Sequence, residues 1–465
     1  MKNSPRLRAA ISVCTAAASW ALLSAARLAY GQASASTIAR ITPAALTSPV
    51  TPAVNTLVQR GAYLARVGDC AACHTAPGGK PFAGGLPMDT PFGTIYSTNI
   101  TPDKDTGIGG YSFQAFDDAV RRGISKRNGH LYPAMPYPSF RILSHDDMDA
   151  LYAYFMKGIA PVNQPDRPNQ LPFPLNVRAL MIGWNLLYLK ADTPYRNDPS
   201  KSVEWNRGAY LVQGLGHCGA CHTPHGATGQ EKAFSEKDGK RYLSGATLAG
   251  WNAPPLADGL STGLAGWSTE ELAAFLKTGR GAHTAAFGAM TEVVNDSTQH
   301  LSDADLNAIA VYLKSLTPED IALGPPVSAA EAASATRALR AGDLRARGAA
   351  TYLDNCNACH RSDGTGAGQT FPSLSGNPVV NAVDPTALIH IVLTGSKMPS
   401  SSAMPAPLAM PDFGWRLSDQ QVADVLTFVR GSWGNQAEPV DVSTVKKLRV
   451  TLHAQAPLRS APRGP

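Results

Sequence analysis

The stretch Cys70-Ala71-Ala72-Cys73-His74 decides how this chain is interpreted. Its pattern, two cysteines separated by two residues and followed at once by a histidine, recurs as Cys218-Gly219-Ala220-Cys221-His222 and Cys356-Asn357-Ala358-Cys359-His360. Two thiols at this spacing add to the two vinyl groups of a haem, and the adjacent histidine is then held beneath the iron as its proximal ligand. The sequence therefore predicts three covalently bound haem c groups.

Two other kinds of site use paired cysteines. A structural zinc site needs two pairs about 15–20 residues apart, and these three pairs are far more widely separated. Local disulfides or thioredoxin-like redox pairs suit an oxidising compartment, but they explain neither the histidine after each pair nor the absence of a βαβ pattern. Haem attachment is therefore the favoured interpretation of all six cysteines.

Each motif opens a repeated unit. An Arg-Gly-Ala triplet precedes the first cysteine by 10, 11 and 9 residues, which predicts a helix of two to three turns with the cysteines at its C-terminal end. The triplets begin at Arg60, Arg207 and Arg347. A serine and a helical apolar pattern close each unit. These closing serines are Ser144, Ser302 and Ser418, and a further helix is predicted before each of them, over residues 113–122, 270–278 and 385–393.

The repeats predict an all-α fold of three tandem class I cytochrome c modules with long loops. The modules are predicted over residues 55–165, 203–318 and 343–435. Residues 166–202 form a Pro-rich linker with a short apolar segment, residues 319–342 an Ala/Pro-rich linker, and residues 436–465 a polar tail.

The apolar part of the first linker, residues 177–189, is too short to cross a bilayer. A helix of this kind packs on its own domains, on a partner or along a membrane surface, and packing on the domains is the favoured expectation.

The N-terminus predicts export. Residues 1–33 combine early cations, an apolar run over residues 9–23 and small residues at the end, which is the pattern of a cleaved secretory signal peptide rather than a retained anchor. Removing this segment lowers the formal net charge from +6 to +2, since it carries four cations and no acid. Six haem propionates would bring the charge to about −4, and no basic patch indicates a nucleic-acid partner.

The sixth iron ligand is expected from the far side of each pocket, where electron-transfer cytochromes commonly place a methionine. The candidates are Met135 in the first unit and Met290 in the second. The third unit offers Met398, Met404 and Met410, of which Met410 is preferred because its distance from the closing helix best matches that of Met135.

The other histidines near the predicted pockets are His130, His283 and His390. Each is interpreted as a surface or structurally satisfied residue, with His130 as the fallback sixth ligand of the first haem. Backbone carbonyls near Pro77 and Pro224 are expected to accept the Nδ1 proton of the first two haem histidines. The third unit has no such proline, so a different orientation is expected for His360.

Three six-coordinate irons leave no open position for chemistry, so the predicted role is electron relay, with no catalytic residue in this chain. Two alternatives stay open. One is a self-contained haem enzyme, such as a peroxidase or reductase, with one five-coordinate iron. The other is a soluble shuttle that delivers electrons to a terminal oxidase.

The chain also resembles the triple-haem cytochrome c subunit of bacterial membrane-bound dehydrogenases that act on alcohols, aldehydes, gluconate, sorbitol or glucose. The similar segments are residues 68–79, 91–103, 132–137, 414–419 and 432–435. The resemblance implies a periplasmic protein, associated with the inner membrane, that takes electrons from a dehydrogenase subunit containing FAD or PQQ. It further implies that a small third subunit is a possible partner and that ubiquinone receives the electrons.

Overall fold

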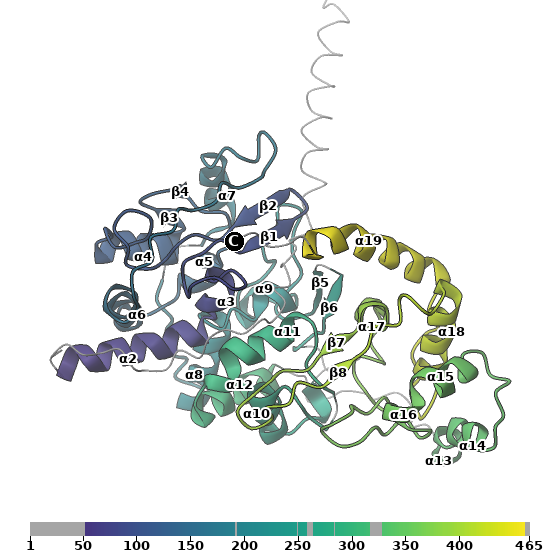
Figure 1. Cartoon of the computed structure of the whole chain (residues 1–465). Coiled ribbons are helices and arrows are strands. Elements are labelled where there is room, and N and C mark those ends of the chain that lie inside the picture. Colours follow the sequence, from purple (N-terminus) through teal and green to yellow (C-terminus); the bar gives the residue numbers. More distant parts are fainter. Residues whose placement is uncertain are drawn as a thin grey trace, which may run out of the picture.

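The computed structural model describes residues 52–190, 193–248, 250–257, 264–282, 284–316 and 328–460. The predicted signal peptide, residues 1–33, lies outside them. In Figure 1 the described chain passes from purple on the left, through teal in the centre, to yellow on the right. The three repeated units thus follow one another in space in the order of the sequence.

The first module places its long helices around the first cysteine motif. Its elements are α2 (Pro52–Val67), α3 (Cys70–His74), β1 (Pro87–Thr90), β2 (Gly93–Tyr96), α4 (Phe113–Arg122), β3 (Ile124–Ser125), β4 (Gly129–His130), α5 (Tyr137–Phe140) and α6 (His145–Lys157). Helices α2 and α6 pack against each other, and α4 lies against α6.

The other two modules repeat this order. The second contains α8 (Val203–Gln213), α9 (Gly219–His222), β5 (Ala246–Leu248), β6 (Trp251–Ala253), α10 (Thr269–Thr278), α11 (Ala289–Glu292) and α12 (Asp303–Ser315), with short helical turns at Glu236–Asp238, Leu264–Gly266, Val293–Ser297 and Thr298–His300. The third contains α15 (Ala349–Asn355), α16 (Asn357–His360), α17 (Thr386–Thr394), β7 (Ser396–Lys397), β8 (Ala409–Met410) and α18 (Asp419–Arg430). Helix α8 packs on α12, and α15 packs on α18, as α2 packs on α6.

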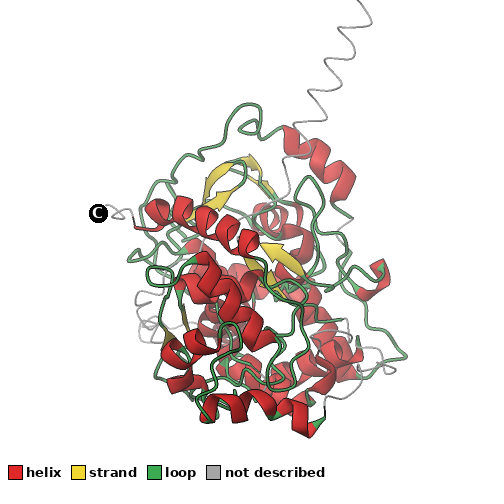
Figure 2. Ribbon diagram, turned by 90° about the vertical axis from the view of Figure 1, so that its right-hand side faces the viewer, coloured by secondary structure: helices red, strands yellow, loops and turns green. Residues whose placement is uncertain are grey.

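The expectation of an all-α fold needs a correction, because strands accompany the helices. The described residues form four antiparallel two-stranded ribbons, and Figure 2 shows strands as yellow arrows among the red helices. The strands of these ribbons are only two to four residues long. Such short strands carry no alternation of apolar and polar residues that a sequence could reveal.

The predicted helix starts are confirmed. The hydroxyls of Ser144, Ser302 and Ser418 each accept a hydrogen bond from the backbone N–H three residues later, and so cap the closing helices. The first helix of each unit, by contrast, ends before the cysteines. Helix α2 ends at Val67, and Asp69 adopts a left-handed φ of 51° before α3 begins. A positive φ is incompatible with a right-handed helix, so in the first unit the helix does not carry Cys70 at its end as expected. In the third unit Cys356 directly follows α15 as its C-cap, so the expectation holds there.

The glycine of each Arg-Gly-Ala triplet permits the close crossing of the first and last helices. A Cβ on Gly61 would lie 1.9 Å from the carbonyl oxygen of Ala150, and one on Gly208 would lie 1.9 Å from that of Ala308. Gly348 faces the Asp424 carbonyl in the same way, at 2.2 Å. The repeated glycine is therefore explained by backbone contact between helices.

We expect Gly208→Ala to lower the free energy of unfolding by about 1–3 kcal/mol, because the new methyl group must push α8 and α12 apart. Urea unfolding of the haem-containing protein measures the change. The matched control is Gly183→Ala, whose Cβ would meet no atom within 4 Å. Equal stability of the two variants would contradict the proposed role of the glycine.

The first and second modules form one body. A single hydrophobic core runs through both, and it includes Leu64 and Phe155 from the first and Trp205 and Leu306 from the second. The third module has a separate core. Modules 1 and 2 are therefore expected to unfold together.

A reciprocal set of hydrogen bonds joins the same two modules. The Tyr63 hydroxyl donates to Asp305 Oδ2 at 2.6 Å, and the Tyr210 hydroxyl donates to Asp147 Oδ2 at 2.5 Å. Each of these aspartates also forms an ion pair with the triplet arginine of its own module. The pairs are Arg60–Asp147 and Arg207–Asp305. We call these six side chains the Tyr–Asp clasp.

The third module docks on the second. The ring of His390 in α17 stacks on Trp251 in β6, with centroids 3.7 Å apart and planes inclined by 15°. The Arg280 guanidinium donates to the Ala406 carbonyl at 2.5 Å, and the Thr247 hydroxyl donates to Asp384 at 2.9 Å. The second module is therefore in contact with both of the others.

The segments around module 3 contain helices that the linker and tail predictions did not anticipate. Helices α13 (Ala329–Ala332) and α14 (Ser334–Arg340) lie in the second linker, and α19 (Val442–Ser460) lies in the region expected to be a polar tail. Leu339 belongs to the module 3 core, as do Val445 and Leu452. These few apolar residues, spaced along a largely polar segment, give α19 a narrow buried stripe.

The apolar part of the first linker forms α7 (Leu180–Tyr188), in the upper part of the described chain in Figure 1. It contains no buried residue. One side contacts the modules, where Asn185 accepts a hydrogen bond from the Tyr137 hydroxyl and the Trp184 indole donates to the Thr228 carbonyl. The favoured expectation that this segment packs on the domains is therefore met only on that side.

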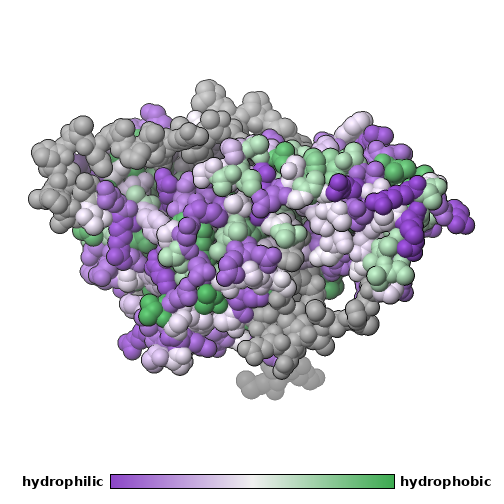
Figure 3. Space-filling view, turned by 90° about the horizontal axis from the view of Figure 1, so that it is seen from below, coloured by the Kyte–Doolittle hydropathy of each residue, from purple (hydrophilic) through white to green (hydrophobic). Residues whose placement is uncertain are grey.

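The other side of this segment is exposed and apolar. Half of the large hydrophobic residues exposed in the described chain lie here: Phe173, Leu175, Val177, Leu180, Ile182, Leu186 and Leu187. On the face shown in Figure 3, by comparison, green apolar areas are small and lie among hydrophilic ones. In the described part of the chain, no helix is both long and apolar enough to span a bilayer.

Candidate haem sites

The three motif histidines are oriented in the same way. His74 Nδ1 lies 2.7 Å from the Thr98 carbonyl oxygen, and His222 Nδ1 lies 2.7 Å from that of Pro254. Because a carbonyl only accepts, each Nδ1 carries the proton, and each Nε2 keeps its lone pair for a metal. The carbonyls near Pro77 and Pro224 were therefore the wrong acceptors.

The third histidine needs the same correction. His360 Nδ1 lies 3.0 Å from the Pro372 carbonyl oxygen, so its ring is fixed as in the other two sites. A different orientation was expected because the sequence after His360 lacks a nearby proline, but the acceptors come from loops 12 to 32 residues away. Burial lowers the pKa of all three histidines, which keeps their rings neutral.

None of the six motif cysteines forms a disulfide. Burial is the largest cause of the raised pKa values, about 12, of Cys70, Cys73, Cys218, Cys221 and Cys356. Among the described residues, no three His, Cys, Asp or Glu side chains converge as a metal cage.

The candidate methionines lie against the same cores as the cysteines. Met135 and Met290 pack against the shared core of modules 1 and 2, to which Cys70 and Cys218 also contribute. Met410, in β8, packs against the module 3 core, as does Cys356. These placements favour Met410 over the two other methionines of its module, and iron ligation by the three methionines stays a prediction.

The other candidate histidines have structural positions. His130 lies in β4, where its carbonyl accepts a hydrogen bond from Arg178. His390 is 0 % exposed, and its Nδ1 donates to the Gly250 carbonyl at 2.8 Å. His283 lies outside the described residues.

The first two sites lie close together. Besides burial and Asp69, the nearby Cys221 contributes to the raised pKa of Cys73. The Tyr–Asp clasp and the common core hold the two attachment motifs in this arrangement. Sequence reasoning missed the clasp, although the tyrosine three positions after each arginine, in the first two units only, was a signal for it.

The chain matches the cytochrome c family three times, over residues 58–158, 206–317 and 345–433. The chain belongs to the cytochrome c family. These ranges fall on the three observed modules, and each contains one Cys-x-x-Cys-His motif. Free cysteines and oriented neutral histidines fit the covalent haem c that such modules carry.

Similar proteins are cytochrome subunits of dehydrogenases. The gluconate 2-dehydrogenase cytochrome c subunit of Pantoea cypripedii is 50% identical over 398 residues, which are 84% of this chain and 90% of that protein. The alcohol dehydrogenase (quinone) cytochrome c subunit of Gluconobacter oxydans is 46% identical over 85% of this chain and 82% of its own length. The fructose dehydrogenase cytochrome subunit of Gluconobacter japonicus is 37% identical over 84% of this chain and 82% of its own length.

Haem c supplies one-electron transfer at iron. At each site two cysteines would attach the haem, the neutral imidazole of the motif histidine would be held for the iron, and apolar side chains surround the motif. The second module of this cytochrome is in contact with both of its neighbours.

Proposed function

We propose that this cytochrome relays electrons from a periplasmic dehydrogenase subunit, containing FAD or PQQ, to ubiquinone at the membrane. The observation that carries the proposal is the row of three haem modules, joined by the Tyr–Asp clasp and by the Trp251–His390 stack. Electron tunnelling falls steeply with distance, so modules held in contact favour transfer along the chain. The names of the relatives support a dehydrogenase as the donor and a quinone as the acceptor.

Within this proposal the six cysteines attach three haems. His74 and Met135, His222 and Met290, and His360 and Met410 would hold the three irons. Three irons of this kind bind no substrate, and no residue of this chain acts on the donor molecule. The oxidised substrate belongs to the partner subunit.

Purification from native membranes tests the proposal. We expect a larger FAD- or PQQ-containing subunit to co-purify, its substrate to reduce all three haems, and ubiquinone to reoxidise them. A cytochrome that is recovered alone and reacts only with a terminal oxidase would support a soluble shuttle. Carbon monoxide binding to the reduced wild-type protein would support a haem enzyme with an open iron.

We further propose that the exposed apolar side of residues 173–187 lies on the membrane surface. Its side chains are exposed to water in this chain, Leu186 by 85% and Leu187 by 73%. Between residues 168 and 190 the chain carries no acid that would repel anionic headgroups. Its two cations have protein partners, Lys190 in Asp238 and Arg178 in the His130 carbonyl, so the apolar side chains would provide the binding. Burial of such side chains among lipid chains would favour binding by about 25 cal/mol per Å².

Replacing both Leu186 and Leu187 by aspartate is expected to weaken binding of the cytochrome to liposomes of zwitterionic and anionic phospholipids by about tenfold or more. Flotation of the haem-containing protein with liposomes measures the binding. Val383→Asp is the matched control, since Val383 is also exposed, by 83%, but lies in module 3. Unchanged flotation of the double variant would contradict membrane contact by α7.

A further inference from the structure

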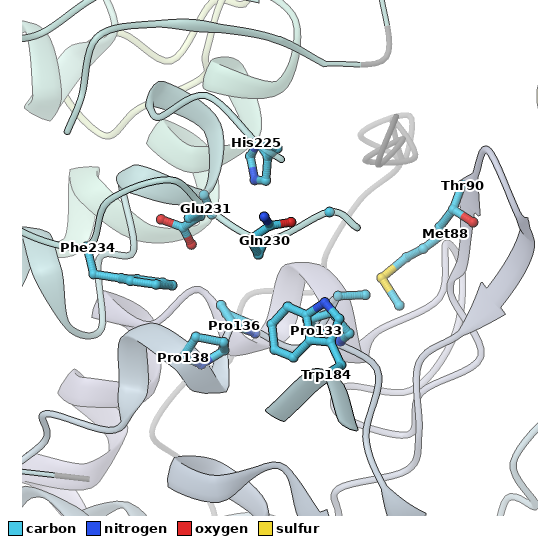
Figure 4. Close-up of a pocket in the computed structure, with 13 residues that line it drawn as sticks. Met88, Thr90, Pro133, Pro136, Pro138, Trp184, His225, Gln230, Glu231 and Phe234 are labelled. Carbon is cyan, nitrogen blue, oxygen red and sulfur yellow. The ribbon is translucent and has the colours of Figure 1, made fainter. Parts of the chain in front are cut away.

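Buried ionisable side chains at the contacts between modules differ in whether they can become neutral. In the pocket that residues of modules 1 and 2 line, shown in Figure 4, burial raises the pKa of Glu231 to about 8. That carboxyl is therefore largely protonated and neutral at neutral pH. At the contact between modules 2 and 3, Arg280 is only 6 % exposed, and a guanidinium does not lose its proton in a protein. Arg280 therefore needs an anion.

The contact between modules 2 and 3 brings their methionine-bearing loops together. Thr291, next to Met290, donates a hydrogen bond from its hydroxyl to the Lys397 carbonyl at 2.9 Å. A Cβ on Gly279, the C-cap of α10, would lie 2.3 Å from Pro399 Cγ. The chain that leads from α10 to Met290 therefore lies directly against the loop of module 3 that leads to its own predicted ligand.

The Arg280 guanidinium reaches from this contact into the third module. Its Nη1 donates to the Gln369 carbonyl at 3.4 Å, and its Nη2 donates to the Ala406 carbonyl at 2.5 Å. Gln369 lies three residues before Pro372, whose carbonyl orients the third motif histidine. Ala406 lies four residues before Met410, the predicted iron ligand. The guanidinium thus contacts both the loop on the histidine side of the third site and the loop on its methionine side.

The positive charge of Arg280 lacks a counter-charge. Its Nε is buried without a hydrogen-bond partner, and no acidic side chain among the described residues forms an ion pair with it. The two carbonyl groups accept hydrogen bonds but carry no net charge, so they leave the guanidinium unbalanced in the protein interior. The unpaired Nε–H and the planar fork of the guanidinium fit a carboxylate, which accepts two parallel hydrogen bonds.

The fold of a module does not require a cation at the position of Arg280. In each module a glycine ends the helix before the methionine loop, and the next residue is Ile124, Arg280 or Ser396. Only the second module has a cation at this position, and there the side chain enters the next module. Arg280 therefore serves the contact between modules 2 and 3 rather than the folding of its own module.

We propose that Arg280 of module 2 binds a propionate of the third haem and so joins the two modules through the prosthetic group. Haem c carries two propionate carboxylates, and the third haem is expected between the two loops that the guanidinium contacts. A cation beside a haem disfavours the additional positive charge of ferric iron, so Arg280 should raise the potential of this haem. This role of Arg280 depends on neither the electron donor nor the electron acceptor proposed above.

Spectroelectrochemical titration of the full chain with its three haems tests this role. We expect Arg280→Gln to lower the ratio of reduced to oxidised haem about tenfold at a fixed potential, a shift of about 59 mV, for one haem only. Arg280→Lys keeps the positive charge and should leave that haem close to wild type, although it loses the guanidinium fork. Arg241→Gln is the matched control, because Arg241 is an exposed residue of the same module.

A second experiment identifies the haem. In the module 3 methionine variant that binds carbon monoxide, expected to be Met410→Ala, carbon monoxide holds the third haem reduced and leaves the other two to be titrated. Adding Arg280→Gln should then change neither of the two remaining potentials. A change in one of them would assign the propionate to another haem and overturn the proposed link. If Arg280→Gln and Arg280→Lys shift one haem equally, or neither shifts any, Arg280 has only a structural role and the proposal is wrong.

Discussion

Replacing Met410 by alanine is expected to open one haem, and only that one, to carbon monoxide. The thioether of a distal methionine occupies the sixth position of the iron and favours its reduced state. Without it, the ferrous iron has a free position for carbon monoxide. The potential of this haem should also fall, by on the order of 0.1 V, within the range of roughly 0.8 V that axial ligands control.

The third module supplies its own controls. Met398 and Met404 lie in the same loop region, and neither belongs to the packing around the module 3 core that includes Met410. Met398→Ala and Met404→Ala should therefore leave the reduced spectrum insensitive to carbon monoxide. If Met398→Ala opened the haem and Met410→Ala did not, the ligand assignment in this module would have to be exchanged.

Removing the carboxylate of Asp305 is expected to have the largest effect on stability. This group is 11 % exposed and binds both Arg207 of its own module and Tyr63 of the first. Asp305→Ala leaves a partly buried arginine without its partner, a change that commonly costs about 3–5 kcal/mol. Because the two modules share a core, both should lose stability together.

Urea unfolding followed by haem absorbance and by far-ultraviolet circular dichroism measures this change. Asp303→Ala is the matched control, since Asp303 lies on the same helix and its side chain is 95% exposed. It should cost about 1 kcal/mol or less, mainly through the charge at the helix N-terminus. Unfolding of module 2 alone in Asp305→Ala would show that the Tyr–Asp clasp does not couple the modules.

The same carboxylate predicts the acid response of this pair of modules. Burial alone would raise the pKa of Asp305, but the hydrogen bonds from Arg207 and Tyr63 outweigh it and hold the pKa below its ordinary value. A depressed pKa in the folded state stabilises the protein above the unfolded value, about 3.9. This contribution is lost as the pH falls through the folded pKa, so wild type should lose more stability below about pH 4 than Asp305→Ala does.

The sequence by itself predicted the haem attachment sites and determined the helix starts. Attachment needs two thiols and an imidazole at fixed short spacing, and a helix cap needs a serine next to the first turn. Both are local, so Cys70, His74 and Ser144 could be assigned without coordinates. The three repeats then predicted three modules, because segments with similar sequence patterns form similar structural units.

Only the tertiary structure decided which groups far apart in the sequence meet. The acceptor of the His74 proton is Thr98, and Tyr63 reaches Asp305 across 242 positions of the chain. The side of α7 that stays exposed depends likewise on how the modules pack. Such contacts depend on how the helices cross and where the long loops run. Local residue spacing does not reveal them, because they form only when distant segments pack together and gain free energy jointly.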